Sequence, residues 1–253
     1  MIASLPMYDR PETASALDRL WVNFRDAWPG APAGLTRDGN PWNHWRHSEL
    51  LLSQTCGLPY RARLHGSVQL VGAPVHDLPC LEGRYFSTII VRADDNRTTL
   101  AEFAGTRPAI NDSLSQSGWA ALEAKAREDG FHFFEPVITG SHAASAHAIA
   151  NRVADIAAID AVSWKYIKEF DGLEAALKEI GHTRPTPALP YITAKTQDAR
   201  KVFDTLRNAI QNLEDADRRL LCLKGLARVH ARDYLELPMP AALSRIPSRK
   251  CSS

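Results

Sequence analysis

The sequence predicts an α/β protein made of two lobes, and three observations lead to this prediction. Short segments rich in β-branched residues, such as 67–75 (SVQLVGAPV) and 84–92 (RYFSTIIVR), have strand character. Beyond Arg92 strand-like and helix-like segments alternate, which is typical of a largely parallel sheet with helices on both faces. Two extended segments, around 87–92 and 185–192, bracket this compact stretch and are predicted to be the crossovers between the lobes.

The two crossovers define the predicted domain boundaries. Lobe one is expected to be discontinuous, comprising residues 1–87 and 186–253, and lobe two is expected to span 88–185. Two α/β lobes joined in this way describe a hinged clamp, with the ligand cleft at the carboxyl ends of the strands. At 253 residues with 45% hydrophobic side chains, the chain is long enough for cores of this size.

The individual elements follow from periodicity and from turn residues. Segments 11–28, 115–130 and 141–154 show helical spacing, and Gly130 is expected to end the second of them. Segment 131–140 is strand-like, 155–164 is a buried strand leading into a helix, and 183–194 is extended and punctuated by proline. Segment 196–226 is predicted to be helical, with a break near 212–215.

The charge balance excludes some classes of partner. Lys and Arg number 30 against 29 Asp and Glu, so no broad field attracts nucleic acid or an anionic membrane. No apolar run approaches the ~18 residues of a membrane span. The first residues, MIASLPMYDRPETA, do not resemble a secretory signal. As written, the chain is expected to be cytoplasmic, unless it is exported by a route that the sequence does not show.

Signatures of enzymes and metal sites are absent from the sequence. It contains no G-x-S-x-G elbow, no phosphate-binding P-loop and no H-E-x-x-H motif. The four cysteines form no C-x-x-C pair; Cys56 and Cys80 could pair in an oxidising compartment, although inert thiols are favoured. His44 and His47 could share a metal, but a role in a loop or rim is favoured. We therefore predict no catalytic residue, no cofactor and no metal.

The strongest local signal is the segment 111–118 (NDSLSQSG), directly followed by a helix. A helix N-terminus exposes unpaired N–H groups and a partial positive charge. Ser115 and Ser117 can donate to the same anion, and Gly118 lets an oxyanion approach the backbone closely. The pattern is also that of a plain serine N-cap, and taken alone it favours the cap.

Two further strand-to-helix transitions carry polar residues. In 139–145 (TGSHAAS), His142 could donate to a phosphate-like oxygen, although a lone histidine in such a turn is more often structural. In 154–160 (ADIAAID), Asp160 ends an apolar strand, where it could face a cleft or cap the next helix. The sequence does not decide between these two roles of Asp160.

An ordered set of motifs resembles a known family. MYDRPE (7–12), LLSQTCG (51–57), Gly83-x-Tyr85-x-Ser87, NDSLSQSG, TGSHAAS, ADIAAID and TPALPYITA (186–194) occur in the order found in phosphate/phosphite/phosphonate substrate-binding proteins. That family lies within the type II periplasmic-binding-protein superfamily. The resemblance covers roughly residues 7–195. It implies a Venus-flytrap clamp that binds an oxyanion for an ABC transporter.

The resemblance also assigns candidate ligand contacts. Carried over position by position, they are Tyr8, Gln54, Thr55, Tyr85, Ser115, Ser117, His142 and Asp160. Tyr85, Ser115, Ser117 and His142 would contact the anionic head, and Asp160 would face the polar or amino end of the ligand. The implied partners are a small anion such as phosphate or a phosphonate and an ABC permease, and the implied compartment is the periplasm.

Three functions therefore compete at the level of the sequence. The leading expectation is a binding protein without catalytic activity. The alternatives are a cytosolic enzyme on the same fold, of the menaquinone-pathway type, or a ligand-sensing module. The sequence does not identify the ligand, the oligomeric state or the export route.

Overall fold

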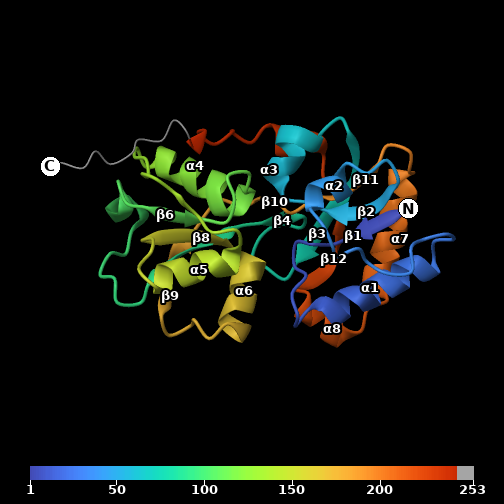
Figure 1. Cartoon of the computed structure of the whole chain (residues 1–253), viewed down its shortest axis with the longest axis horizontal. Helices are drawn as coiled ribbons and strands as arrows, with labels where there is room; N and C mark the ends of the chain where they lie inside the picture. Colours follow the sequence, from blue (N-terminus) through green and yellow to red (C-terminus); the bar gives the residue numbers. More distant parts are fainter. Residues whose placement is uncertain (244–253) are drawn as a thin grey trace. The chain divides into compact units, whose positions relative to one another are not determined.

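The computed structural model describes residues 1–243, and these divide into two compact units (Figure 1). Unit 1 consists of Met1–Tyr85 and Thr186–Glu236, and unit 2 consists of Phe86–Pro185 together with the described residues Leu237–Leu243. The sequence predicted crossings near residues 87 and 186, but it assigned the stretch after Glu236 to lobe one. The described end of that stretch, Leu243, packs against the core of unit 2 instead.

Unit 1 is built on a five-stranded sheet of order β1-β2-β11-β3-β12 and a two-stranded ribbon of β4 and β10. β1 and β2 are parallel, whereas β11 runs antiparallel to both β2 and β3, and β12 runs antiparallel to β3. The strands are β1 (Ile2–Ser4), β2 (Leu50–Gln54), β3 (Val68–His76), β4 (Arg84–Tyr85), β10 (Thr186–Pro187), β11 (Tyr191–Ala194) and β12 (Leu223–Ala227).

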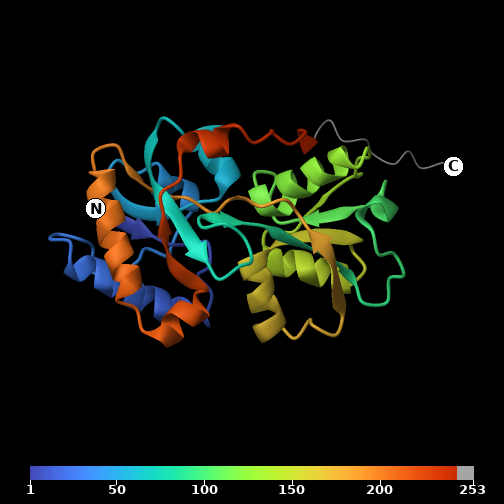
Figure 2. The ribbon, with the colours of Figure 1, turned by 180° about the vertical axis from the view of Figure 1, so that it is seen from behind.

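Helices cover both faces of this sheet. The helical elements are α1 (Ala14–Asp26), α2 (Pro41–Trp45), α3 (Gly57–Pro59), the π-helical turn η1 (Tyr60–Leu64), α7 (Ala199–Gln211), α8 (Asp215–Leu220) and α9 (Ala231–Leu235). Helices α1 and α7 lie side by side in Figures 1 and 2 and share one core with the sheet, through Trp21, Phe24, Phe203 and Leu206. A second core contains Tyr60, Tyr234 and Ile192.

Unit 2 contains a five-stranded sheet of order β7-β6-β8-β5-β9. Its strands are β5 (Ser87–Arg92), β6 (Pro108–Ile110), β7 (Val137–Ile138), β8 (Ile156–Asp160) and β9 (Leu177–His182). β6 is parallel to both β7 and β8, whereas β5 is antiparallel to β8 and to β9. The predicted parallel arrangement therefore holds for three neighbouring strands of unit 2 and not for most of unit 1.

The alternating side chains of the strands give unit 2 a core on each face of its sheet. Ile89 and Val91 point to the face covered by Trp119 and its helix, whereas Ile90 points to the opposite face with Trp164. The helical elements are η2 (Leu100–Phe103), η3 (Gln116–Ala120), α4 (Ala121–Glu128), α5 (His142–Ala150) and α6 (Ala161–Phe170). Figure 1 shows α4 on one side of the strands and α5 and α6 on the other.

Two expectations about local structure are wrong. Segment 223–227 is strand β12 and not helix: Cys222 has a φ of 49°, which ends the preceding helical turn, and the chain then pairs with β3. Segment 131–134 forms no strand, because Gly130 (φ 81°) and Glu135 (φ 34°) interrupt the extended backbone, while Phe133 is drawn into the core. β9 has no counterpart in the sequence prediction.

The helices of the described residues are all too short or too polar to span a bilayer.

A close approach at Gly72 in β3 gives the first testable prediction. A Cβ atom at this position would lie 2.8 Å from the carbonyl oxygen of Ala227 and 3.0 Å from the ring of Phe203. We expect Gly72→Ala to lower the free energy of unfolding by about 1–3 kcal/mol, because β3 cannot shift without disturbing β12. The control is Gly34→Ala, where a Cβ atom meets nothing within 4 Å. Equal urea midpoints for the two variants would contradict the expectation.

Burial of His76 gives a prediction about pH. Its Nδ1 lies 3.1 Å from the carbonyl oxygen of Cys222, and burial lowers its pKa from 6.5 to about 4. As the pH falls below 6.5 the unfolded chain takes up a proton first, so the free energy of unfolding decreases until about pH 4, by about 3 kcal/mol at most.

Urea titrations at neutral pH and at about pH 4.5 check this expectation. His76→Gln should lose less stability than the parent protein between the two conditions. His65→Gln, which changes an exposed histidine of the same unit, should behave like the parent. If His76→Gln showed the full loss, His76 would not be the group responsible.

Candidate functional site

The carboxyl ends of three neighbouring strands bring the predicted residues of unit 2 to one edge of its sheet. β6 is parallel to both β7 and β8, so the segments that follow these strands start at the same edge. Asn111 and the serine turn follow β6, the turn before His142 follows β7, and Asp160 ends β8. This edge is where open α/β sheets place their ligands.

The serine turn (residues 115–118) opens a continuous helix formed by η3 and α4. Ser115 is the N-cap, and its Oγ accepts a 2.9 Å hydrogen bond from the N–H of Gly118. The N-cap interpretation of Ser115 therefore describes the structure. The turn is nevertheless buried, since Ser115, Gln116 and Ser117 are each 3% exposed.

Glycine is required at position 118 by the residue that follows β6. A Cβ atom there would lie 1.9 Å from Oδ1 of Asn111, an oxygen that is itself buried and has no hydrogen-bond partner among the described residues. The sequence suggested that Gly118 leaves room for an oxyanion. In the structure the space is taken by the side chain of Asn111.

His142 joins the serine turn from the next strand-to-helix transition. Its Nε2 lies 2.9 Å from Oγ of Ser117, and its Nδ1 is buried without a hydrogen-bond partner in the described part of the chain. Burial lowers the pKa of His142 from 6.5 to about 4. The imidazole is therefore neutral at physiological pH, and the pair offers uncharged hydrogen-bonding groups.

Asp160 lies at the same edge but is engaged in a structural role. It is 2% exposed, and its Oδ1 accepts from the N–H groups of Val162 (2.9 Å) and Ser163 (3.0 Å) at the start of α6. Of the two roles that the sequence left open, the cap is thus present. Ser87 lies opposite Asp160 in the sheet, and its Oγ donates to the carbonyl oxygen of Ser117 at 3.0 Å.

Ser87 is a residue whose role sequence reasoning missed, because it was treated as part of a strand motif. Its hydroxyl connects β5 to the serine turn, while its position in the sheet is opposite Asp160. The signal available in the sequence was a serine at the first position of a strand whose centre, residues 89–91, is apolar.

Tyr8, Gln54 and Thr55 lie near the carboxyl ends of β1 and β2 in unit 1. Tyr8 contacts the ring of His76 edge-on, with 5.5 Å between the ring centroids, and Gln54 donates to the carbonyl oxygen of Leu189 at 3.2 Å. These two side chains and His76 line a small cavity of about 20 Å³, enough for one water molecule. The Oγ1 of Thr55 is buried and has no hydrogen-bond partner among the described residues.

Tyr85 is 1% exposed and pairs with Thr186 in the ribbon of β4 and β10. Near it lies a buried cation that sequence reasoning missed, Arg61 of η1, which is 9% exposed. Burial lowers the pKa of Arg61, while Cys56 and Tyr85 act in the opposite direction. The sequence offered no signal for Arg61, since YRARLHG contains two arginines and no periodicity that distinguishes the buried one.

The net charge of the predicted contacts shows why Arg61 matters. The eight side chains include one carboxylate, that of Asp160, and His142 is neutral above about pH 4. The predicted set therefore contains no permanent cation to balance an anionic ligand. Arg61 supplies one within unit 1.

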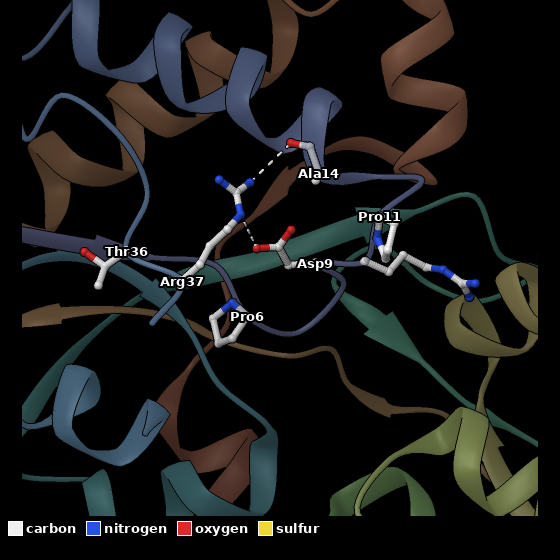
Figure 3. A pocket seen from close by; sticks show the side chains of 7 residues that line it. Pro6, Asp9, Pro11, Ala14, Thr36 and Arg37 are labelled. Carbon is white, nitrogen blue, oxygen red and sulfur yellow. Dashed lines mark hydrogen bonds and ion pairs between the residues drawn. The ribbon is translucent and has the colours of Figure 1, made fainter. Parts of the chain in front are cut away.

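An open pocket of about 420 Å³ lies in the segment that contains the MYDRPE motif (Figure 3). Arg37 there donates to Asp9 at 2.7 Å and to the carbonyl oxygen of Ala14 at 3.3 Å, and Arg10 contacts Glu12 at 2.5 Å. Both arginines thus contact carboxylates, and none of the eight predicted residues lines this pocket. It is a poor candidate for the anion site.

The remaining candidates from the sequence are separated or structural. Among the described residues Cys56, Cys80 and Cys222 form no disulfide, and Cys251 lies outside the described residues. His44 is buried with its Nδ1 3.1 Å from Oγ of Ser4, whereas His47 is exposed and accepts from the N–H of Glu49 at 3.1 Å.

Comparison with known structures identifies the fold. PhnD1 from Prochlorococcus marinus, in complex with methylphosphonate, is 16% identical with a TM-score of 0.68, covering 92% of this chain and 94% of that one. A binding protein component of an ABC phosphonate transporter from Pseudomonas aeruginosa is 16% identical with a TM-score of 0.69, covering 92% and 82%. These likenesses confirm the predicted two-lobed fold of periplasmic binding proteins.

A third similar structure binds a different kind of anion. The alkanesulfonate-binding protein SsuA from Xanthomonas axonopodis pv. citri, bound to MOPS, is 15% identical with a TM-score of 0.62, covering 92% of this chain and 88% of that one. The fold alone therefore does not select the ligand.

The family is given by the sequence itself. No curated protein matches the chain. The model of the family described as "ABC transporter, phosphonate, periplasmic substrate-binding protein" matches residues 55–234, a stretch that includes six of the eight predicted contacts and Arg61. This chain belongs to the family of periplasmic substrate-binding proteins of phosphonate ABC transporters.

Proposed function

We propose that this protein binds a small oxyanion, a phosphonate or phosphate, for an ABC-type transport system and catalyses no reaction. The observation that carries the proposal is the buried serine turn with the neutral His142 on Ser117. Its partners are then the anion and an ABC permease. The similar structures that hold methylphosphonate and MOPS support an anion as the ligand class.

The chemistry of the turn suits an oxyanion. Buried hydroxyl groups and the N–H groups of a helix N-terminus donate hydrogen bonds in a region from which water is largely excluded. The neutral imidazole of His142 holds the hydroxyl of Ser117 in position, at 2.9 Å, without adding a charge. Such a site recognises the arrangement of oxygen atoms around phosphorus or sulfur.

Unit 1 supplies further contacts in this proposal. Tyr8, Gln54, Thr55 and Tyr85 remain the proposed polar contacts, and Arg61 is added as the cation beside Tyr85. Asp160, which already caps α6, is proposed to face the polar or amino end of a phosphonate. A thermal-shift screen with phosphate, methylphosphonate, sulfate and small carboxylates tests the ligand class. Stabilisation by none of these anions would refute the proposal.

Removing one hydroxyl from the turn should weaken binding. A hydrogen bond to a charged group is worth about 1.5–3 kcal/mol, so Ser117→Ala should raise the Kd for the best ligand of the screen by about 10- to 150-fold. Calorimetric titration measures the change. Ser113→Ala, which removes an exposed hydroxyl four residues earlier, is the matched control and should bind as the parent does. Unchanged binding by Ser117→Ala would remove Ser117 from the site.

The charge of Arg61 should favour a dianion over a monoanion. At a pH where methylphosphonate is doubly ionised, Arg61→Met should weaken its binding by about 10- to 150-fold and that of methanesulfonate by a smaller factor. Arg63→Met changes an exposed arginine of the same helical turn and should leave the ratio of the two affinities unchanged. If Arg61→Met weakened both anions equally, Arg61 would have a structural role.

A further inference from the structure

A second pocket of unit 1 is not explained by the proposed function. It has a volume of about 230 Å³ and lies where α2 ends, where β3 begins and where β11 ends. Its apolar part is formed by Trp45, Val68 and Ala194, which are 5%, 9% and 5% exposed. Its polar part includes Arg46, His47 and Lys195, all of which are exposed.

The charges that line this pocket are all positive. No carboxylate is among the lining residues, and within residues 1–243 neither Arg46 nor Lys195 has a salt-bridge partner. The guanidinium of Arg46 lies instead over the ring of Trp42, at 5.0 Å from its centroid. Glu49, the acid nearest to Arg46 in the sequence, contacts the amino group of Met1 at 3.3 Å. The pocket therefore carries two permanent positive charges that form no ion pair with an acid of the described residues.

The tautomer of His47 adds a donor. Its Nδ1 accepts a hydrogen bond from the N–H of Glu49 at 3.1 Å, so in the neutral ring the proton is on Nε2. The free edge of the imidazole then donates, like the two cations. An anion is the ligand type that all three groups favour.

The walls of the pocket are held in place by hydrogen bonds. The Nε2 of Gln69 donates to the carbonyl oxygens of Ala194 (3.1 Å), Lys195 (3.2 Å) and Gln197 (2.6 Å), which fixes the chain after β11. The Oγ1 of Thr196 donates to the carbonyl oxygen of Ser48 at 3.1 Å and ties that segment to the one after α2. A ligand would therefore meet a pre-formed backbone frame, which reduces the entropy lost on binding.

The register of the sheet separates this pocket from the candidate ligand contacts of unit 1. Ala194 pairs with Val68, whereas Tyr191, at the other end of β11, pairs with Gln54. The pocket thus lies at the opposite end of the strands from Gln54 and Thr55. It is not a part of the proposed oxyanion site.

We propose that this pocket is a second anion site, and that it takes a small carboxylate with an apolar body, such as an aromatic or short-chain acid. The apolar floor and the cationic rim match the two ends of such a molecule. An inorganic anion would satisfy the rim and leave the floor without a partner. The volume is below the ~300 Å³ at which sites for larger ligands begin, so the ligand is small.

Benzoate, benzamide and inorganic phosphate distinguish the contributions of charge and shape. We expect benzoate to shift the backbone amide resonances of residues 46–48, 67–69 and 194–196 in a ¹H–¹⁵N NMR titration. Benzamide has the same shape without the charge, and it should bind at least fivefold more weakly. Phosphate should shift the same resonances less at equal concentration. Equal affinities of benzoate and benzamide, or the absence of shifts at these residues, would overturn the proposal.

Variants locate the site. The double variant Arg46→Met/Lys195→Met should bind benzoate about tenfold more weakly, while its amide spectrum elsewhere remains that of the parent. Arg200→Met removes an exposed cation of α7 that does not line the pocket, and it should bind benzoate as the parent does. A double variant with unchanged affinity would place benzoate elsewhere. Because neither outcome involves Ser117, this test stands apart from that of the proposed function.

Discussion

The candidate site of unit 2 depends on the parallel pairing of β6 with its two neighbours, β7 and β8. Parallel strands end at the same edge of a sheet, so three loops that are far apart in the sequence start side by side. The shared location of Asn111, His142 and Asp160 at one edge of the sheet follows from this single constraint. The hydrogen bond between Ser117 and His142 then joins two of those loops, and the hydroxyl of Ser87 fastens the arrangement to β5.

Much of this arrangement could be predicted because its local signals agree with its tertiary role. The local sequence predicts a helix start at the serine turn, a helix end at Gly130 and a buried strand before Asp160. The folded unit contains the same three features. Segment 223–227 is different: its leucines continue the helical pattern of α8, and it becomes a strand because β3 has an unpaired edge for it. The local sequence of a short segment does not show whether a distant strand will pair with it. Strands of this kind therefore cannot be predicted from their own residues alone.

The predicted contacts show the same division. Ser115 and Asp160 were each assigned two possible roles from the sequence, and the structure contains the capping role of both. Whether a buried helix-capping side chain also faces a ligand depends on side chains from other parts of the chain. A local sequence pattern gives no information about them. Arg61 could not be found at all, since nothing in the local sequence distinguishes it from Arg63, yet Arg61 is buried and Arg63, two residues later, is exposed.

The contact between Gly118 and Asn111 constrains which substitutions the serine turn can accept. No side chain fits at position 118 while Asn111 occupies the neighbouring space, so a single substitution there would damage the turn before it altered the ligand. If the serine turn binds the oxyanion as proposed, a new specificity would have to arise at other positions of the turn, such as Gln116, or through a paired replacement that first removes the side chain of Asn111. Gly118 would therefore stay unchanged while neighbouring positions are substituted, and a substitution of Asn111 would have to precede any substitution of Gly118.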